Sequence, residues 1–169
     1  VHAIEARTEA QAEPALTTLA TPGVPTTVHF SDANSQASER DCYHHMNVVH
    51  SWVKQVTPSY TGVDYEMTGT VNINQTCNAN WDGSGINFFK QGGGCTNTAQ
   101  IADVVYHEYG HGNNQFAFAP ASPTGAQHEG FADYHGATLT NQPDIGRGFY
   151  GANTILRTCD NNRQYPSPE

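Results

Sequence analysis

The stretch VVYHEYGHGNN, residues 104–114, carries the pattern H-E-x-x-H at His107, Glu108 and His111. On an α-helix, residues four positions apart lie on the same face, about one turn from each other. Both imidazoles can therefore bind one ion with Zn–N distances of about 2.0–2.1 Å. Glu108 follows the first histidine and points beside the ion, where a general base for a metal-activated water must lie. The pattern predicts a zinc-binding helix that carries its own base.

A catalytic zinc site needs a third protein ligand and one open coordination position. Glu129 is the predicted third ligand, and it lies on a second segment with helical character. Asp133 lies four positions further, on the same helix face, and we expect it to orient His107 through the ring N–H that does not bind the metal. His128 and His135 are the alternatives to Glu129 for the ligand role, although both face elsewhere on that helix.

Composition and charge limit the classes of protein that fit. The 169 residues suffice for one domain or for one lobe of a larger enzyme, and the formal net charge is −9. An acidic chain without a basic cluster repels nucleic acid and anionic lipid, so neither is an expected partner. No segment is apolar enough to span a membrane. The low content of charged residues, 14%, and the first residue, Val1, favour a secreted chain with a processed N-terminus.

Four cysteines, at Cys42, Cys77, Cys95 and Cys159, form no C-x-x-C pair. This pattern favours two disulfides over a cysteine metal site. Three connectivities are compatible with the sequence. The preferred one joins Cys77 to Cys95, because this bond closes a short loop, and Cys42 to Cys159.

The pattern of turn residues and hydrophobic residues divides the chain into three parts. Residues 1–37 are expected to be an extended lead-in with one short strand at 26–30. Residues 38–140 are expected to form an α+β metal-binding region, and residues 141–169 the beginning of a C-terminal lobe with a short helix near 154–157.

Within the central part, helical periodicity and strand-like alternation occur in separate segments. Ser38 has the spacing of a capping box for the first helix, and Gly112 is a suitable stop for the second. Short alternating pieces at 63–89 predict antiparallel sheet. The expected helices span residues 38–56, 98–111 and 126–139.

With these segments in place, His107, Glu108 and His111, followed by Glu129 and Asp133, resemble the gluzincin pattern of thermolysin-like metallopeptidases. The fungalysin branch is the nearest. The resemblance implies a zincin-type α+β fold, a zinc ion on His107, His111 and Glu129, and a polypeptide substrate. It also implies an endopeptidase in which Glu108 is the general base.

Two further segments agree with this resemblance. CNANWDG, residues 77–83, is similar to the family segment N-A-F-W-N-G, an edge strand that pairs with the substrate backbone. The match implies that Asn78 and Ala79 bind substrate. Asp103, four residues before His107, matches a family position that contributes to a calcium site, so Ca²⁺ is an additional expected ion.

The sequence departs from the family at two places. Residues 112–128 contain no tyrosine that could stabilise the oxyanion, and the family's later helical lobe, with its oxyanion histidine and pocket-closing arginine, is expected to be missing or incomplete. A second chain that completes this lobe is therefore an expected partner. Two alternatives stay open: a non-catalytic zinc-binding lobe, and a zinc aminopeptidase, which would need a G-x-M-E-N motif that the chain lacks.

Overall fold

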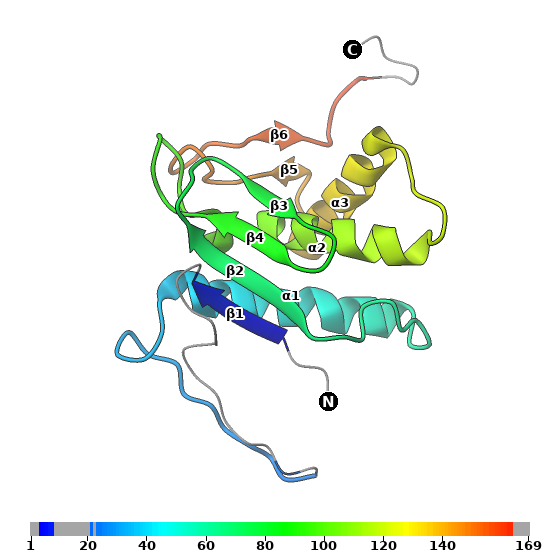
Figure 1. Cartoon of the computed structure of the whole chain (residues 1–169). Coiled ribbons are helices and arrows are strands. Elements are labelled where there is room, and N and C mark those ends of the chain that lie inside the picture. The colour runs from blue at the N-terminus through cyan, green and yellow to red at the C-terminus, as the bar shows by residue number, and fades with distance from the viewer. Residues whose placement is uncertain (1–3, 9–20, 22, 164–169) are drawn as a thin grey trace.

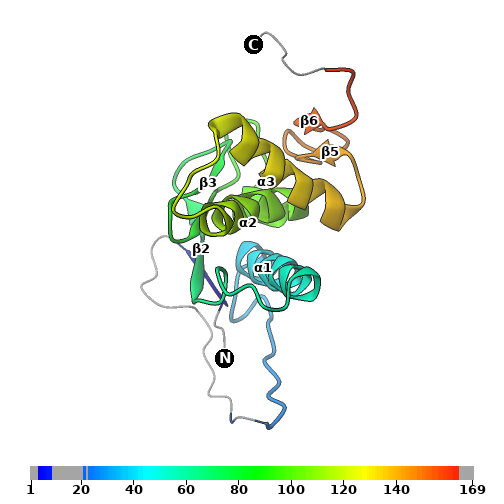
Figure 2. The same cartoon turned by 90° about the vertical axis from the view of Figure 1, so that its right-hand side faces the viewer.

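A mixed four-stranded sheet with the strand order β1-β2-β4-β3 forms one layer of the computed structural model, which describes residues 4–8, 21 and 23–163 (Figure 1). The strands are β1 (Ile4–Thr8), β2 (Met67–Ile73), β3 (Ala79–Trp81) and β4 (Ile86–Phe89). The helices lie on one side of this layer (Figure 2). Together with its helices, this sheet confirms the predicted α+β class.

The expectation of an antiparallel sheet is wrong for two of the three strand pairs. β2 pairs in parallel with both β1 and β4, and only the β3–β4 pair is antiparallel. Strand pairing depends on segments that are distant in the sequence, so local alternation could not reveal it. β1 was not predicted either, because it belongs to the segment expected to be an extended lead-in. The strand expected at 26–30 is absent, and Val28 and Phe30 are exposed there.

Helix α1 (Ala37–Val56) supplies the apolar face that covers the sheet. Its residues Cys42, Met46, Val49 and Val53 are buried, and they recur at the spacing of one helix face. The helix begins earlier than predicted. Ser38 already lies inside it, and the Glu39 carboxylate accepts a 2.6 Å hydrogen bond from the N–H of Gln36, the actual N-cap.

Helix α2 (Ala102–Ala117) continues six residues beyond the predicted end at His111. A short 3-10 helix, η1 (Thr98–Gln100), precedes it, so the α-helix itself begins later than the predicted residue 98. Gly112 does not stop α2. A Cβ at this position would lie 3.0 Å from the Trp81 ring, so the glycine makes room for β3 against the helix.

Helix α3 (Gly125–Thr140) lies where the sequence predicted a helix, at 126–139. It packs closely along α2. Gly110 of α2 faces Ala132 of α3, and a Cβ on Gly110 would lie only 2.9 Å from the Ala132 Cα. The missing side chain therefore allows the two backbones to approach closely. This contact brings the first turn of α3 next to the two histidines of α2.

The chain after α3 forms a two-stranded antiparallel sheet of β5 (Asp144–Ile145) and β6 (Arg157–Thr158). Residues 154–157, predicted as a short helix, lead instead into β6, and the Leu156 N–H donates to the Ile145 carbonyl oxygen. The division of the chain at residues 37 and 140 stays a prediction.

One of the two preferred disulfides is present. Cys77 and Cys95 are bonded, with a Cα–Cα distance of 5.3 Å. The Cys42–Cys159 pairing is wrong, and both thiols are free. Cys42 is completely buried on the inner face of α1, whereas Cys159 is exposed after β6. No helix in the described part of the chain is both long and apolar enough to cross a membrane.

Candidate metal centre and active site

The side chains of His107 and His111 converge on one position beside α2. Their Nε2 atoms lie 3.0 Å apart, with the rings nearly perpendicular at 86°. The His107 side chain is only 9% exposed and that of His111 12%. One helical turn separates the two residues, so the helix geometry alone places them on the same face.

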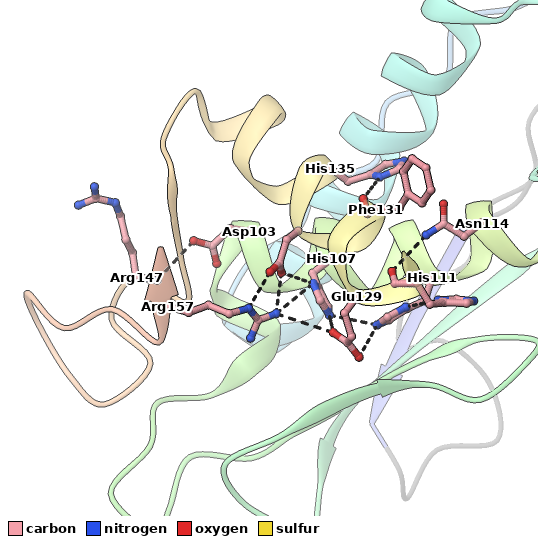
Figure 3. Close-up of polar contacts among 11 residues, drawn as sticks. Asp103, His107, His111, Asn114, Glu129, Phe131, His135, Arg147 and Arg157 are labelled. Carbon is pink, nitrogen blue, oxygen red and sulfur yellow. Dashed lines mark hydrogen bonds and ion pairs between the residues drawn. The ribbon is translucent and has the colours of Figure 1, made fainter. Parts of the chain in front are cut away.

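Glu129, in the first two turns of α3, brings its carboxylate to the same position (Figure 3). Its Oε2 lies 3.2 Å from the His107 Nε2, and its Oε1 lies 3.7 Å from the His111 Nε2. Ligand atoms of a tetrahedral zinc ion with bonds of about 2.0–2.1 Å are about 3.3–3.4 Å apart. The three separations bracket this value, so the donor set fits a zinc-sized ion, and these residues form a group that could hold a metal.

His107 is held from behind by a carboxylate. Its Nδ1 lies 2.8 Å from the Asp133 Oδ1, and Arg157 of β6 bonds both oxygens of Asp133 at 2.6 and 2.7 Å. Burial acts to lower the pKa of His107, but the hydrogen bonds to Asp133 and Glu129 outweigh it and raise that pKa to about 9. Burial acts to raise the pKa of Asp133, but its hydrogen bonds with His107 and Arg157 outweigh this effect and lower that pKa to about 2.

His111 has a different neighbour behind it. Its Nδ1 lies 2.6 Å from the Nδ1 of His128, the residue before Glu129. Burial, followed by the positive charge of His107, lowers the pKa of His111 to about 4. Without metal, His111 is therefore neutral near pH 7, while His107 is protonated.

Glu108 lies beside this group and is not part of it. Glu108 is only 5% exposed, and its carboxylate accepts a hydrogen bond from the backbone N–H of Trp81 in β3. Burial is the main cause that raises the pKa of Glu108 to about 7. A carboxylate with a pKa near the working pH is suited to take up and return a proton.

A pocket of about 770 Å³ opens in front of these residues. Asn78 and Ala79 line this pocket at the start of β3, which is an edge strand of the sheet. Asn78 is exposed and Ala79 is buried. The pocket also has apolar lining residues, which are Val104, Ile145, Phe149 and Leu156.

Asp103 lies away from the pocket and belongs to no group of metal-ligating side chains among the described residues. Its Oδ2 accepts a hydrogen bond of 3.3 Å from the Arg147 N–H, so the carboxylate ties the loop after β5 to the start of α2 (Figure 3). Burial raises the pKa of Asp103. The expected calcium site at Asp103 stays a prediction.

Sequence reasoning considered His128 and His135 only as alternative ligands, and it did not single out Arg157. His135 is buried and contacts Asn113 and the Phe131 carbonyl oxygen, so both of its ring nitrogens are engaged away from the metal position. Arg157 lines the pocket, and its Nη2 comes within 4.0 Å of the Glu129 carboxylate. No local motif marks this arginine, because β6 reaches the site only through tertiary packing.

Comparisons with known proteins agree with the fold. No family model matches the sequence, and no curated protein matches it. Among solved structures, the chain is similar to the precursor of protealysin, a metalloproteinase from Serratia proteamaculans, with 19% sequence identity and a TM-score of 0.58. The match covers 82% of this chain but 42% of that one, so the chain spans less than half of its structural neighbour. The likeness establishes a shared fold.

Proposed function

We propose that this chain is the zinc-binding catalytic region of an endopeptidase of the thermolysin-like gluzincin type, nearest the fungalysin branch. The observation that carries the proposal is the placement of Glu108. Its buried carboxylate lies next to three converging ligand groups without being one of them, and all four residues face the pocket. A purely structural zinc site has four protein ligands and needs no neighbouring base.

The division of roles follows from the geometry. His107, His111 and Glu129 would hold the ion, which supplies Lewis-acid activation of a water molecule and of the scissile carbonyl group. Glu108 accepts the proton of the attacking water and returns it to the leaving amine. Asp133 keeps the His107 ring in place through Nδ1, and Arg157 in turn holds Asp133.

The substrate is proposed to be an extended polypeptide that lies along β3. Asn78 and Ala79 line the pocket at the start of this strand, and backbone pairing there would give affinity with little sequence selectivity. Secretion, and a second chain that completes a C-terminal lobe, belong to the same proposal. Its support is the fold shared with a metalloproteinase precursor and the disulfide Cys77–Cys95.

The test is the variant Glu108→Gln, compared with Glu66→Gln, which changes an exposed glutamate far from the ligand group in the sequence. Both variants and the parent chain should bind about one zinc ion per chain, measured by elemental analysis. Cleavage of a labelled unfolded protein should fall by about 10²–10⁴ in Glu108→Gln only.

Two outcomes would count against the proposal. Full cleavage by Glu108→Gln would remove this residue as the base. A parent chain that holds one zinc ion but cleaves no unfolded polypeptide, even with a C-terminal lobe supplied, would favour the non-catalytic zinc-binding module.

A further inference from the structure

We propose that His128 is a positioning residue for the metal centre, which holds His111 in the tautomer that presents Nε2 to the ion. This inference rests on the proposed zinc site and assigns a role to a residue outside the ligand set. His128 is not a ligand in this arrangement. It stands behind one, in the position that Asp133 occupies behind His107.

The contact between the two imidazoles is direct. Their Nδ1 atoms lie 2.6 Å apart, the ring centroids are 4.7 Å apart, and the ring planes are inclined by 34°. On the other side of the His111 ring, Nε2 faces His107 at 3.0 Å and Glu129 at 3.7 Å. Both nitrogens of His111 are therefore committed, one to the metal position and one to His128.

The chemistry of neutral imidazole fixes the direction of this hydrogen bond. A ring whose Nε2 binds a metal must carry its proton on Nδ1 and can only donate there. The Nδ1 of His128 must then be the acceptor, so the proton of His128 lies on its own Nε2. One hydrogen bond thus sets the tautomers of both rings.

The backbone of His128 is held in place by contacts with both α2 and α3. Its N–H donates to the carbonyl oxygen of Thr124, the N-cap of α3, at 2.8 Å. Its carbonyl oxygen accepts a 3.3 Å hydrogen bond from the side chain of Asn114, a buried residue of α2. The backbone at this position is therefore fixed, and the next residue is the ligand Glu129. The start of α3 supplies one ligand to the ion and the partner that orients another.

The experiment compares zinc affinity, measured by competition with a chromogenic chelator, in three variants of the full chain. His128→Ala removes the acceptor, and we expect the zinc dissociation constant to rise about 10- to 100-fold. His128→Asn places an amide oxygen near the position of the lost Nδ1, and it should restore affinity to within about threefold of the parent. His44→Ala, which removes an exposed histidine of α1, is the control and should change nothing.

Two further readouts separate a positioning role from a structural one. The melting temperature of the metal-free protein should stay the same in His128→Asn. In the zinc-loaded parent, long-range ¹H–¹⁵N spectra should show His111 protonated at Nδ1 and His128 protonated at Nε2. If His128→Ala fails to fold, the Asn variant and the spectra of the parent carry the test.

The inference would be overturned by parent-like zinc affinity in His128→Ala, or by the opposite tautomer of either ring. A His128→Asn variant as weak as His128→Ala would also contradict it, because a hydrogen-bond acceptor would then not be the cause. Failure of the proposed function looks different: the parent itself would bind no zinc, or would bind it without cleaving polypeptide.

Discussion

The two histidines of the H-E-x-x-H pattern occupy equivalent places on α2, yet the structure supports them with opposite chemistry. His107 is backed by the negative charge of Asp133, which Arg157 holds in turn. His111 is backed by His128, a second imidazole. The pKa of His107 is raised to about 9, whereas that of His111 is lowered to about 4.

The two rings therefore differ in charge in the metal-free protein, and they contribute to the metal centre in different ways. His107 is charged in the metal-free protein and forms an ion pair with Glu129 at 3.2 Å, so it keeps the third ligand close to the metal position. His111 is already neutral and can accept a metal without losing a proton. We infer that Asp133 acts on His107 mainly through its charge, whereas His128 acts on His111 mainly by orienting the ring.

The largest effect on this comparison should come from Asp133→Ala. Loss of the carboxylate removes the orienting partner of His107 and leaves Arg157 without its main contact, so zinc affinity should fall by about 100-fold, at the upper end of the range for such partners. The change is measured by chelator competition, with the exposed Asp160→Ala as control. If Asp133→Ala weakened zinc binding less than His128→Ala does, the carboxylate would not be the stronger of the two partners, and the comparison would be wrong.

A smaller effect is expected from Arg157→Gln. Arg157 bonds Asp133 at 2.6 and 2.7 Å, whereas its Nη2 lies 3.4 Å from the His107 Nδ1 and 4.0 Å from the Glu129 carboxylate. We therefore expect it to act mainly through Asp133. Zinc affinity should therefore fall by about tenfold or less. The matched control is Arg147→Gln, since this exposed arginine pairs with Asp144 instead. An effect as large as that of Asp133→Ala would mean that the arginine, and not the carboxylate, orients His107.

The smallest expected effect concerns the number of protons that the protein releases when it binds zinc. At about pH 8, His107 is mostly protonated in the metal-free protein and must become neutral to bind zinc, so binding should release about one proton per ion. His111, with a pKa of about 4, should release none. Calorimetry in buffers of different ionisation enthalpy measures this number. The release should fall in Asp133→Ala, and an unchanged value there would contradict the assignment to His107.

The same shift sets the pH dependence of the metal-free protein. Folding raises the pKa of His107 above its ordinary value of 6.5. The contribution of this residue to the free energy of unfolding is therefore complete below about pH 6.5, and it is lost as the pH rises through about 9. Thermal midpoints in the presence of a chelator should fall across this window in the parent and change less in Asp133→Ala.

Local signals in the sequence located the three long helices, with errors at the ends of α2, but they did not reveal the pairing of the sheet. The apolar spacing in 38–56 predicted a helix close to α1, because helix contacts repeat within a few residues, and the helix predicted at 126–139 lies close to α3. The parallel pairing of β2 with β1 and β4 joins segments that no short pattern connects. Gly112 was wrongly predicted to end the second helix. Its role is to leave space for the Trp81 ring, a contact that only the fold creates.

The sequence by itself determined where a metal can bind. The periodicity of 3.6 residues per turn places His107 and His111 on one face of the first helix, and Glu129 and Asp133 on one face of the next. Packing of α3 on α2 brings these two faces together. Only the tertiary structure decided how each ligand is tuned. His128 reaches His111 across 17 positions in the sequence, and Arg157 reaches His107 across 50. Electrostatic effects depend on distance in space, and close packing of α2, α3 and β6 sets those distances.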